Sequence, residues 1–300
     1  MSLPESERFE QKLGKPSCVV TMEVNPPKGT DLSDILQAVE GVRGMVDAIN
    51  VTDGSGAIMR ACSLAVANAV LDAGIDPILQ VTCRDRNRLA LQADLLGASI
   101  LGIRNLLLLT GDDPKTGDHP EAKPVFDVNS ATLMHMARGL AQGKDMAGKA
   151  LTGSPQFCIG AAADPGAKDL NVEMQKFHAK LDGGAQFFQT QAVFDASKLR
   201  AFMECAKPFG KPVLAGILLV KSAKMARYMN EHVWGIHVPE ELIARFERST
   251  DPRAECVAVT ADLIRAARRA GANGIHLYAL GWENLIPDIL KEAKLEVLSH

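Results

Sequence analysis

The chain has 300 residues, of which 47% are hydrophobic and 23% charged, enough to bury a core in one large domain or two small ones. Its formal charge of −3 gives no electrostatic reason to expect nucleic acid or an anionic membrane as a partner, and no stretch approaches the roughly 18 apolar residues of a membrane span. Residues 1–16 form a polar N-terminal extension without the apolar segment of a signal peptide, so we expect a cytoplasmic protein.

Short β-branched or leucine-rich runs alternate along the chain with longer amphipathic runs. The short runs predict strands at 18–24, 46–52, 77–82, 105–110, 156–162, 185–191, 212–219 and 273–279. The longer runs predict helices at 31–44, 58–73, 86–100, 129–142, 168–183, 195–207, 221–231 and 251–271. This alternation is typical of βα units around a parallel sheet.

Eight strands over roughly 260 residues match the usual size of a (β/α)8 TIM barrel, so we predict one α/β domain over residues 1–300. A doubly wound sheet is the alternative, but no G-x-G-x-x-G follows the first predicted strand. Residues 229–252 are predicted to form an insertion with a short additional helix before the last βα unit.

The six cysteines are scattered and contain no Cys-x-x-Cys pair, which argues against a disulfide framework and against a zinc or iron–sulfur site. We expect most of them to be small buried residues. The seven histidines show no metal-binding spacing either, so no metal site is predicted.

In a barrel, chemistry lies at the C-terminal ends of the strands. Many polar residues fall there and are expected to line one pocket: Glu23, Thr52, Asp53, Gln80, Thr82, Thr110, Asp112, Asp164, Gln189, Gln191 and Tyr278.

Glu23 interrupts an otherwise apolar strand and is followed by two prolines at positions 26 and 27. The plain alternative is a carboxylate that is paired with a buried lysine or with backbone amides. Its position near the mouth of the barrel favours a chemical role, because partial desolvation favours the neutral form that a proton donor needs.

Three further residues have a structural and a functional interpretation. Asp112 follows a glycine that lets the backbone pass close to a flat ligand, although it could also cap the turn before Pro114. The amide of Gln191 both donates and accepts hydrogen bonds, which suits the edge of an aminopyrimidinone ring, but it could also bond to a loop. Tyr278 is more often a packing residue.

Five segments resemble, in the same order, the bacterial methylenetetrahydrofolate reductases. They are EVNPPKG from Glu23, VTDGSG from Val51, LLLLTGDDP from Leu106, LDGGAQFFQTQAVFD from Leu181 and AGILLV from Ala215, and the similarity extends over residues 18–292. The resemblance implies a flavoprotein barrel that reduces 5,10-methylenetetrahydrofolate to 5-methyltetrahydrofolate by hydride transfer. It also implies an oligomer, a role in methionine biosynthesis, and NAD(P)H or a partner subunit as electron donor.

The resemblance also suggests roles for individual residues. Glu23 matches the general acid that assists opening of the imidazolidine ring, Asp112 the carboxylate between flavin and pterin, and Gln191 a pterin-binding amide, with Tyr278 as a further substrate contact. Residues that match the flavin-binding positions are Thr52, Gln80, Thr110, Gly111, Asp112, Glu173 and Lys180.

The flavin and the reaction both have alternatives. Family members often carry basic residues at the positions of Thr110 and Ala179, so FMN, with its single phosphate near Lys180, competes with FAD. A pterin-binding methyltransferase without redox chemistry would use the same Asp and amide groups. A scaffold subunit without a cofactor is the third possibility, but it would not need carboxylates in a pocket.

Overall fold

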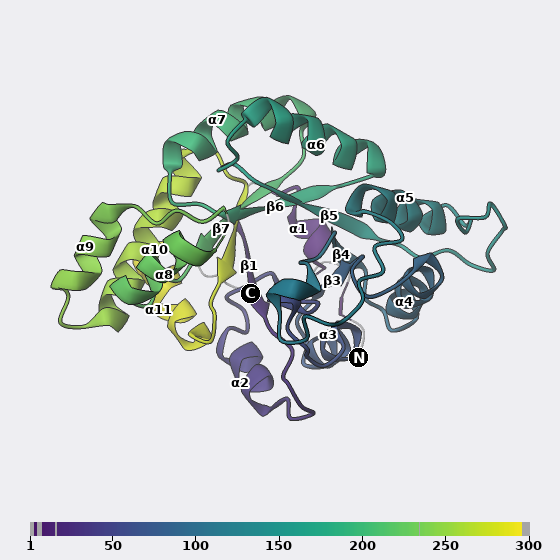
Figure 1. Cartoon of the computed structure of the whole chain (residues 1–300), viewed down its shortest axis with the longest axis horizontal. Coiled ribbons are helices and arrows are strands. Elements are labelled where there is room, and N and C mark those ends of the chain that lie inside the picture. Colours follow the sequence, from purple (N-terminus) through teal and green to yellow (C-terminus); the bar gives the residue numbers. More distant parts are fainter. Residues whose placement is uncertain (1–2, 5–7, 16, 234, 296–300) are drawn as a thin grey trace.

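Eight parallel strands close into a barrel in chain order. Figure 1 shows the strands at the centre of the molecule with the helices around them. The structure is a computed structural model that describes residues 3–4, 8–15, 17–233 and 235–295. The strands are β1 (Val19–Val24), β2 (Ala48–Val51), β3 (Pro77–Thr82), β4 (Asn105–Leu109), β5 (Cys158–Ala163), β6 (Phe187–Ala192), β7 (Val213–Leu218) and β8 (Gly274–Tyr278). Each overlaps one predicted strand, and the closed β1–β8 pairing confirms the (β/α)8 barrel and rules out the doubly wound sheet.

The helices form the outer layer. Those between or after the strands are α2 (Ser33–Gly41), α3 (Ser63–Asp72), α4 (Arg88–Ile100), α5 (Ser130–Ala141), α6 (Leu170–Gly183), α7 (Ala196–Ala206), α8 (Ala223–His232), α9 (Glu240–Arg248), α10 (Pro252–Arg269) and α11 (Ile286–Glu292). Asx or serine side chains at Asn87, Asn129, Asp169, Asp195, Ser222 and Asp251 accept hydrogen bonds from first-turn amides. These caps explain why so many helices begin where they do.

The predicted helix at 58–73 begins later than expected, at Ser63. Residues 55–57 form the short 3-10 helix η2 (Ser55–Ala57), and Ile58 is already in an extended conformation. The backbone amide of Ala61 donates to the carbonyl of Pro27, so this segment is bonded to the loop after β1 instead of to a helix.

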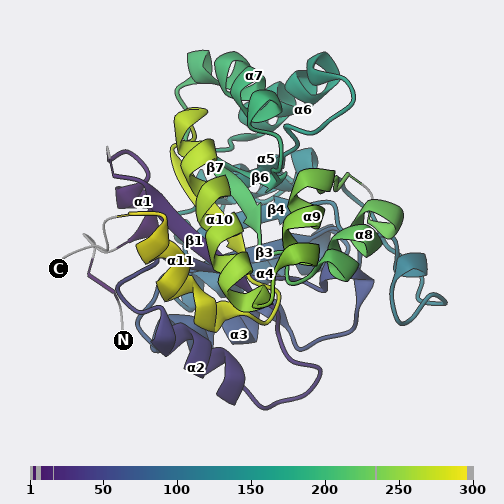
Figure 2. The ribbon, with the colours of Figure 1, turned by 90° about the vertical axis from the view of Figure 1, so that its left-hand side faces the viewer.

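Helix α9 lies within residues 229–252 and packs beside α8, as Figure 2 shows, and it is farther from the strands than α10 in Figure 1. Residues 229–232 belong to the end of α8, and residue 234 lies outside the described residues. The side chain of Asn230, near the end of α8, bonds to the backbone of Val238, just before α9. It donates to the Val238 carbonyl at 2.9 Å and accepts from the Val238 backbone amide at 2.7 Å. Arg227 in α8 also pairs with Glu240 and Glu247 of α9.

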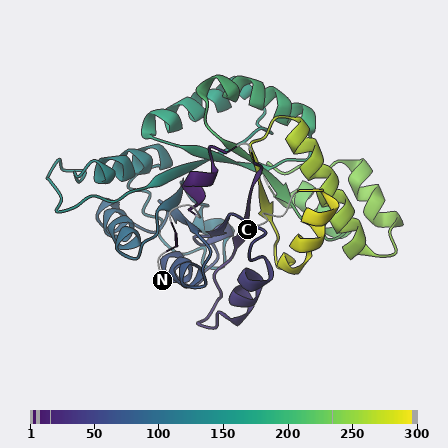
Figure 3. The same ribbon diagram turned by 180° about the vertical axis from the view of Figure 1, so that it is seen from behind.

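The N-terminal segment closes one end of the barrel. Helix α1 (Phe9–Lys12) lies across the ring of strands in Figure 3, and its Phe9 ring is fully buried with its centroid 5.1 Å from that of Phe187. Phe9 belongs to a layer of inward-facing side chains that we call the barrel floor: Phe9, Val19, Ala48, Ile78, Leu107, Cys158, Phe187 and Leu214. The predicted polar extension therefore contains a buried structural element, although residues 1–2, 5–7 and 16 lie outside the described residues.

Burial differs among the six cysteines, which are all free thiols. Cys83, Cys158 and Cys256 are buried, whereas Cys62 and Cys205 are exposed and the remaining one is intermediate. The expectation that most are buried therefore holds for half of them. Burial raises the pKa of Cys83 to about 11, so this thiol stays protonated at neutral pH.

Within the described part of the chain, no helix combines the length and apolar character that crossing a bilayer requires.

We expect Phe9→Ala to lower the free energy of unfolding by about 3–5 kcal/mol, because it leaves a cavity in the barrel floor. Urea denaturation followed by circular dichroism measures this loss. The matched control is Gln11→Ala, an exposed position in the same helix. If both variants unfold like the parent chain, Phe9 does not pack in the barrel floor.

Candidate active site

A cavity of about 280 Å³ opens at the C-terminal ends of the strands. It is lined by Asp53, Ser55, Gln80, Thr82, Leu108, Leu109, Thr110, Gly111, Asp112, Ser130, Ala162, Lys180 and Gln191. A second cavity of about 320 Å³ shares Asp53 with it, and a third of about 440 Å³ shares Arg60 with the second. The polar ends of the strands therefore meet around neighbouring cavities, as expected for the catalytic face of a barrel.

Six of the ten predicted site residues line the first cavity: Gln80, Thr110, Gly111, Asp112, Lys180 and Gln191. The other four, Glu23, Thr52, Glu173 and Tyr278, are not among its lining residues, so the structure does not bring all ten to this one cavity.

An irregularity in β6 sets the position of Gln191. The pairing of β6 with β7 shifts between Gln189 and Ala192, which leaves one extra residue on β6. The Thr190 hydroxyl stabilises this bulge, because it donates to the Gln191 carbonyl and accepts from the Gly216 amide. Bulges redirect side chains next to binding sites, and here Gln191 is exposed at the cavity wall.

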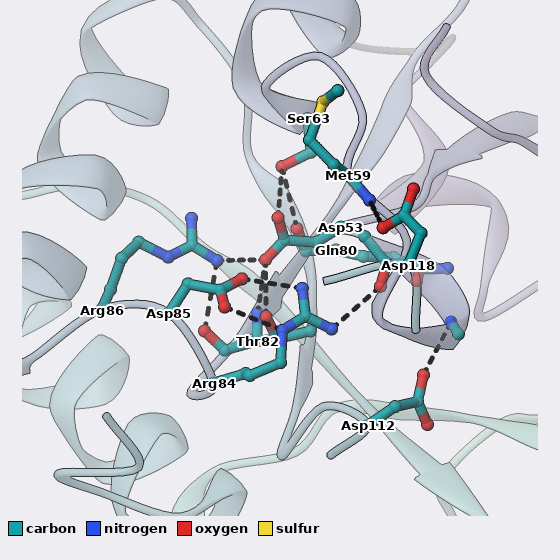
Figure 4. A network of polar contacts seen from close by, with 12 residues as sticks. Asp53, Met59, Ser63, Gln80, Thr82, Arg84, Asp85, Arg86, Asp112 and Asp118 are labelled. Carbon is teal, nitrogen blue, oxygen red and sulfur yellow. Dashed lines mark hydrogen bonds and ion pairs between the residues drawn. The ribbon is translucent and has the colours of Figure 1, made fainter. Parts of the chain in front are cut away.

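The turn after β4 brings the backbone close to β3. Gly111 has φ +94°, and a Cβ atom built on it would lie 2.9 Å from the Cβ of Thr82, so only glycine fits there. The following Asp112 is exposed, and its Oδ2 accepts a hydrogen bond of 2.8 Å from the Gly56 amide (Figure 4). Asp112 thus joins the β4 loop to η2 across the mouth of the cavity.

A network of polar contacts centred on Asp53 connects the loop after β2 to the end of β3 and the loop that follows it, as Figure 4 shows. One oxygen of Asp53 accepts from both the amide and the hydroxyl of Thr82, at 2.8 and 2.9 Å, and also contacts Arg86. Arg84 donates to the Gly54 carbonyl at 2.9 Å and pairs with Asp85. Neither arginine was predicted as a site residue from the sequence, although the charged run 84–86 directly after β3 was an available signal.

Lys180 brings a cation to the opposite wall. Its Nζ donates to the Ala162 carbonyl at the end of β5, at 2.7 Å. Burial lowers the pKa of this ammonium, against the opposing effect of the Glu173 carboxylate. Glu173 itself is buried and accepts from the Asp164 amide at 2.9 Å, so it fixes the loop after β5 instead of facing the cavity.

Glu23 lies above a polar layer inside the barrel. The layer consists of Thr21, Asn50, Gln189 and His276, which are all buried. The amides of Asn50 and Gln189 bond to each other in both directions, at 2.8 and 3.1 Å, and Thr21 bonds to Nδ1 of His276 at 2.9 Å. The Glu23 carboxylate is 10% exposed, and its Oε2 is 3.7 Å from Nε2 of His276.

The side-chain hydroxyls of Tyr278 and Thr52 donate hydrogen bonds to other residues of the barrel and its loops. The Tyr278 hydroxyl donates to the Thr190 carbonyl at 2.9 Å, and its ring lies edge-on to His276. Burial, together with the nearby Glu23 carboxylate, raises the pKa of this phenol. Thr52 is buried and donates to the Asn25 side chain at 2.8 Å. Neither hydroxyl hydrogen is therefore free to donate to a ligand in this arrangement.

Among the described residues, no three His, Cys, Asp or Glu side chains come together in a way that could hold a metal ion.

Comparisons with known proteins bear on this site. The family model described as methylenetetrahydrofolate reductase matches residues 8–294, which is nearly the whole chain. The chain belongs to the methylenetetrahydrofolate reductase family.

Two curated relatives show how divergent this member of the family is. It is 22% identical over 296 residues to methylenetetrahydrofolate reductase 1 of Schizosaccharomyces pombe, covering 94% of this chain and 47% of the relative. It is also 22% identical to the 5,10-methylenetetrahydrofolate reductase of Pectobacterium carotovorum, covering 87% of this chain and 85% of the relative. The chain therefore spans about half the length of the S. pombe relative and most of the bacterial one.

Among solved structures, an uncharacterised protein from Clostridium thermocellum that binds two copies of 5-methyl-5,6,7,8-tetrahydrofolic acid has a TM-score of 0.64. The match covers 95% of this chain and 99% of that protein at 14% identity. It shows a common barrel fold.

We expect Asp53→Asn to destabilise the chain by roughly 2–3 kcal/mol. The Asp53 carboxylate is 15% exposed, accepts two hydrogen bonds from Thr82, and is one of two carboxylates that pair with Arg86, the other being that of Asp94. Glu40→Gln is the control, since its carboxylate is 70% exposed, its partner Arg43 is 45% exposed, and the change should cost much less. Thermal and urea unfolding measure both. Equal losses would mean that Asp53 does not organise the network.

Proposed function

We propose that this protein reduces 5,10-methylenetetrahydrofolate to 5-methyltetrahydrofolate with a bound flavin. The observation that carries the proposal is the family match over residues 8–294, combined with a cavity lined by Asp112 and Gln191. The C. thermocellum protein of the same fold binds methyltetrahydrofolate, which supports a folate as the substrate here.

The residues present fit a flat, polar ring system. The cavity of about 280 Å³ is close to the lower end of ligand pockets, so it suits the rings better than a whole dinucleotide. Gly111 lets the backbone approach a flat ligand, and Lys180 supplies a cation for a phosphate or an electron-rich ring edge. FAD, by family resemblance, and FMN both remain candidates, with Thr110 standing where a basic residue is common in the family.

A reduced flavin, when bound, would supply the hydride. The protein's own residues bind and protonate the substrate. Gln191 can donate to and accept from the edge of the pterin, and the Asp112 carboxylate favours positive charge on the substrate carbon that accepts the hydride. Glu23 donates the proton that assists ring opening, and it lies within reach of the buried His276.

The remaining partners follow from the same proposal. Electrons come from NAD(P)H or from a partner subunit, and the reaction belongs to the one-carbon metabolism of the cytoplasm. We also propose that the protein is an oligomer.

The purified protein should contain or take up flavin, and Glu23→Gln should keep it. We expect flavin reduction by the electron donor to be unchanged in this variant, whereas methylenetetrahydrofolate reduction falls by about 10²–10⁴, the usual contribution of general acid catalysis. Stopped-flow absorbance of the flavin separates the two half-reactions.

The parent chain and Glu241→Gln, a surface carboxylate on α9, serve as controls. Full folate turnover in Glu23→Gln would remove Glu23 from the mechanism. A parent protein that stays colourless after flavin is added, yet transfers a methyl group from methyltetrahydrofolate, would favour the methyltransferase instead of the reductase.

We expect Gln191→Ala to raise the KM for the folate roughly tenfold, because one or two hydrogen bonds to the substrate are lost. Flavin content should stay the same. Gln175→Ala, an exposed amide on α6, is the control. If Gln191→Ala loses flavin while its folate KM is unchanged, the assignment of this wall to the folate is wrong.

A further inference from the structure

A separate cavity of about 680 Å³ lies at the opposite end of the barrel, where the strands begin. Its walls come from the end of α1, the C-terminal half of α7, the start of β7 and the end of α10. Because β7 enters the barrel here at Val213 and ends at Leu218, this cavity and the candidate active site lie on opposite faces. We call it the lower cavity.

The lower cavity is lined by five cationic side chains and one acidic side chain. The cations are Lys15, Arg200, Lys207, Lys211 and Arg269, and the acid is Glu204. Among the described residues, none of the five cations has an ion pair or a side-chain hydrogen bond, although the net charge of the chain is −3. Such a local excess of positive charge attracts anions.

Three other cations on the same face have carboxylate partners. Arg8 pairs with Asp76 at 3.1 Å, and Lys12 with Asp47 at 3.1 Å. Arg104 pairs with Glu10 at 3.3 Å. Around α1, these carboxylates therefore balance the positive charges. Around the lower cavity, the cations have no carboxylate partner among the described residues.

Helix ends account for only part of this charge. Arg269 is the last residue of α10 and Lys207 follows α7, so both complement the negative end of a helix dipole. Lys15 follows α1 and is separate from both of those helices, Arg200 is in the middle of α7, and Lys211 is in the loop before β7. The dipole gives no reason for these three cations to gather at one cavity.

The floor of the lower cavity is apolar. It is lined by Leu13, which is partly exposed, and by the buried residues Met203, Ala206, Val213 and Ala270. A ligand that fits this surface carries clustered negative charge at one end and a flat or apolar group at the other. The volume is within the range of pockets that bind small molecules.

We infer that the lower cavity binds a nucleotide-like small molecule, in which two or more phosphate groups contact the cations and the ring lies on the apolar floor. Arginine and lysine are the usual partners of phosphate, and arginine can bind it through two parallel hydrogen bonds. This site is independent of the proposed reductase activity and of the cavity at the other end of the barrel.

The test uses isothermal titration calorimetry of pyrophosphate and of ADP against the flavin-saturated full chain, with the double variant Arg200→Glu, Lys211→Glu. We expect both probes to bind the parent chain, ADP more tightly than pyrophosphate, with an affinity that falls as salt rises. The double variant should bind each probe at least tenfold more weakly, whereas Lys149→Glu, Lys291→Glu, with the same charge change at two exposed lysines elsewhere, should stay within twofold.

Thermal unfolding of each variant establishes that it is folded before titration. Absence of binding by the parent chain overturns the proposal, and so does an equal loss in both double variants. Displacement of ADP by methyltetrahydrofolate would also overturn it, because it would place the nucleotide at the other end of the barrel. Equal affinities for ADP and pyrophosphate would overturn the contact of the ring with the apolar floor.

Discussion

The buried polar layer inside the barrel is the constraint on which the rest of the structure depends. Buried amides and imidazoles are costly unless they are hydrogen-bonded, and Asn50, Gln189, Thr21 and His276 satisfy one another across four strands. Each member sits at one position on its strand, so a one-residue slip would turn it out of the barrel. The layer therefore specifies the register of β1, β2, β6 and β8 and fixes the height at which Glu23 stands.

The layer also separates two different environments. Below it the interior is apolar, with the Phe187 ring occupying the space beside Gly160, where a Cβ atom would lie 2.2 Å from the ring. Above it the strand ends carry carboxylates, amides and one lysine around the candidate active site. Glu23 lies at this boundary, which gives it contact with His276 below while it keeps slight exposure above. The general-acid role that we propose for Glu23 would require contact with a ligand above this layer.

The sequence predicted the barrel well because its signal is local and repeated: each strand is a short apolar run and each helix a longer amphipathic one. The position of Gln80, Asp112 and Gln191 at one cavity followed from a rule about strand ends and required no contact to be known in advance. The bulge that exposes Gln191 was not predictable, because it depends on the pairing of Thr190 with Gly216 from another strand. Likewise Phe9 stands in a polar segment, and only the folded barrel provides the apolar floor that buries it.

The same reasoning explains why charged residues were harder to interpret than apolar ones. Asp53, Arg84 and Arg86 come from two loops, and the sequence gives no sign that Arg86 meets Asp53 while Arg84 meets a backbone carbonyl. On the opposite face, Lys12 and Lys15 are three residues apart, yet Asp47 pairs with one and no described carboxylate pairs with the other. A parallel barrel brings all the strand starts to one face and all the strand ends to the other. The function of each charge is therefore decided by which neighbours the closed ring of strands places beside it.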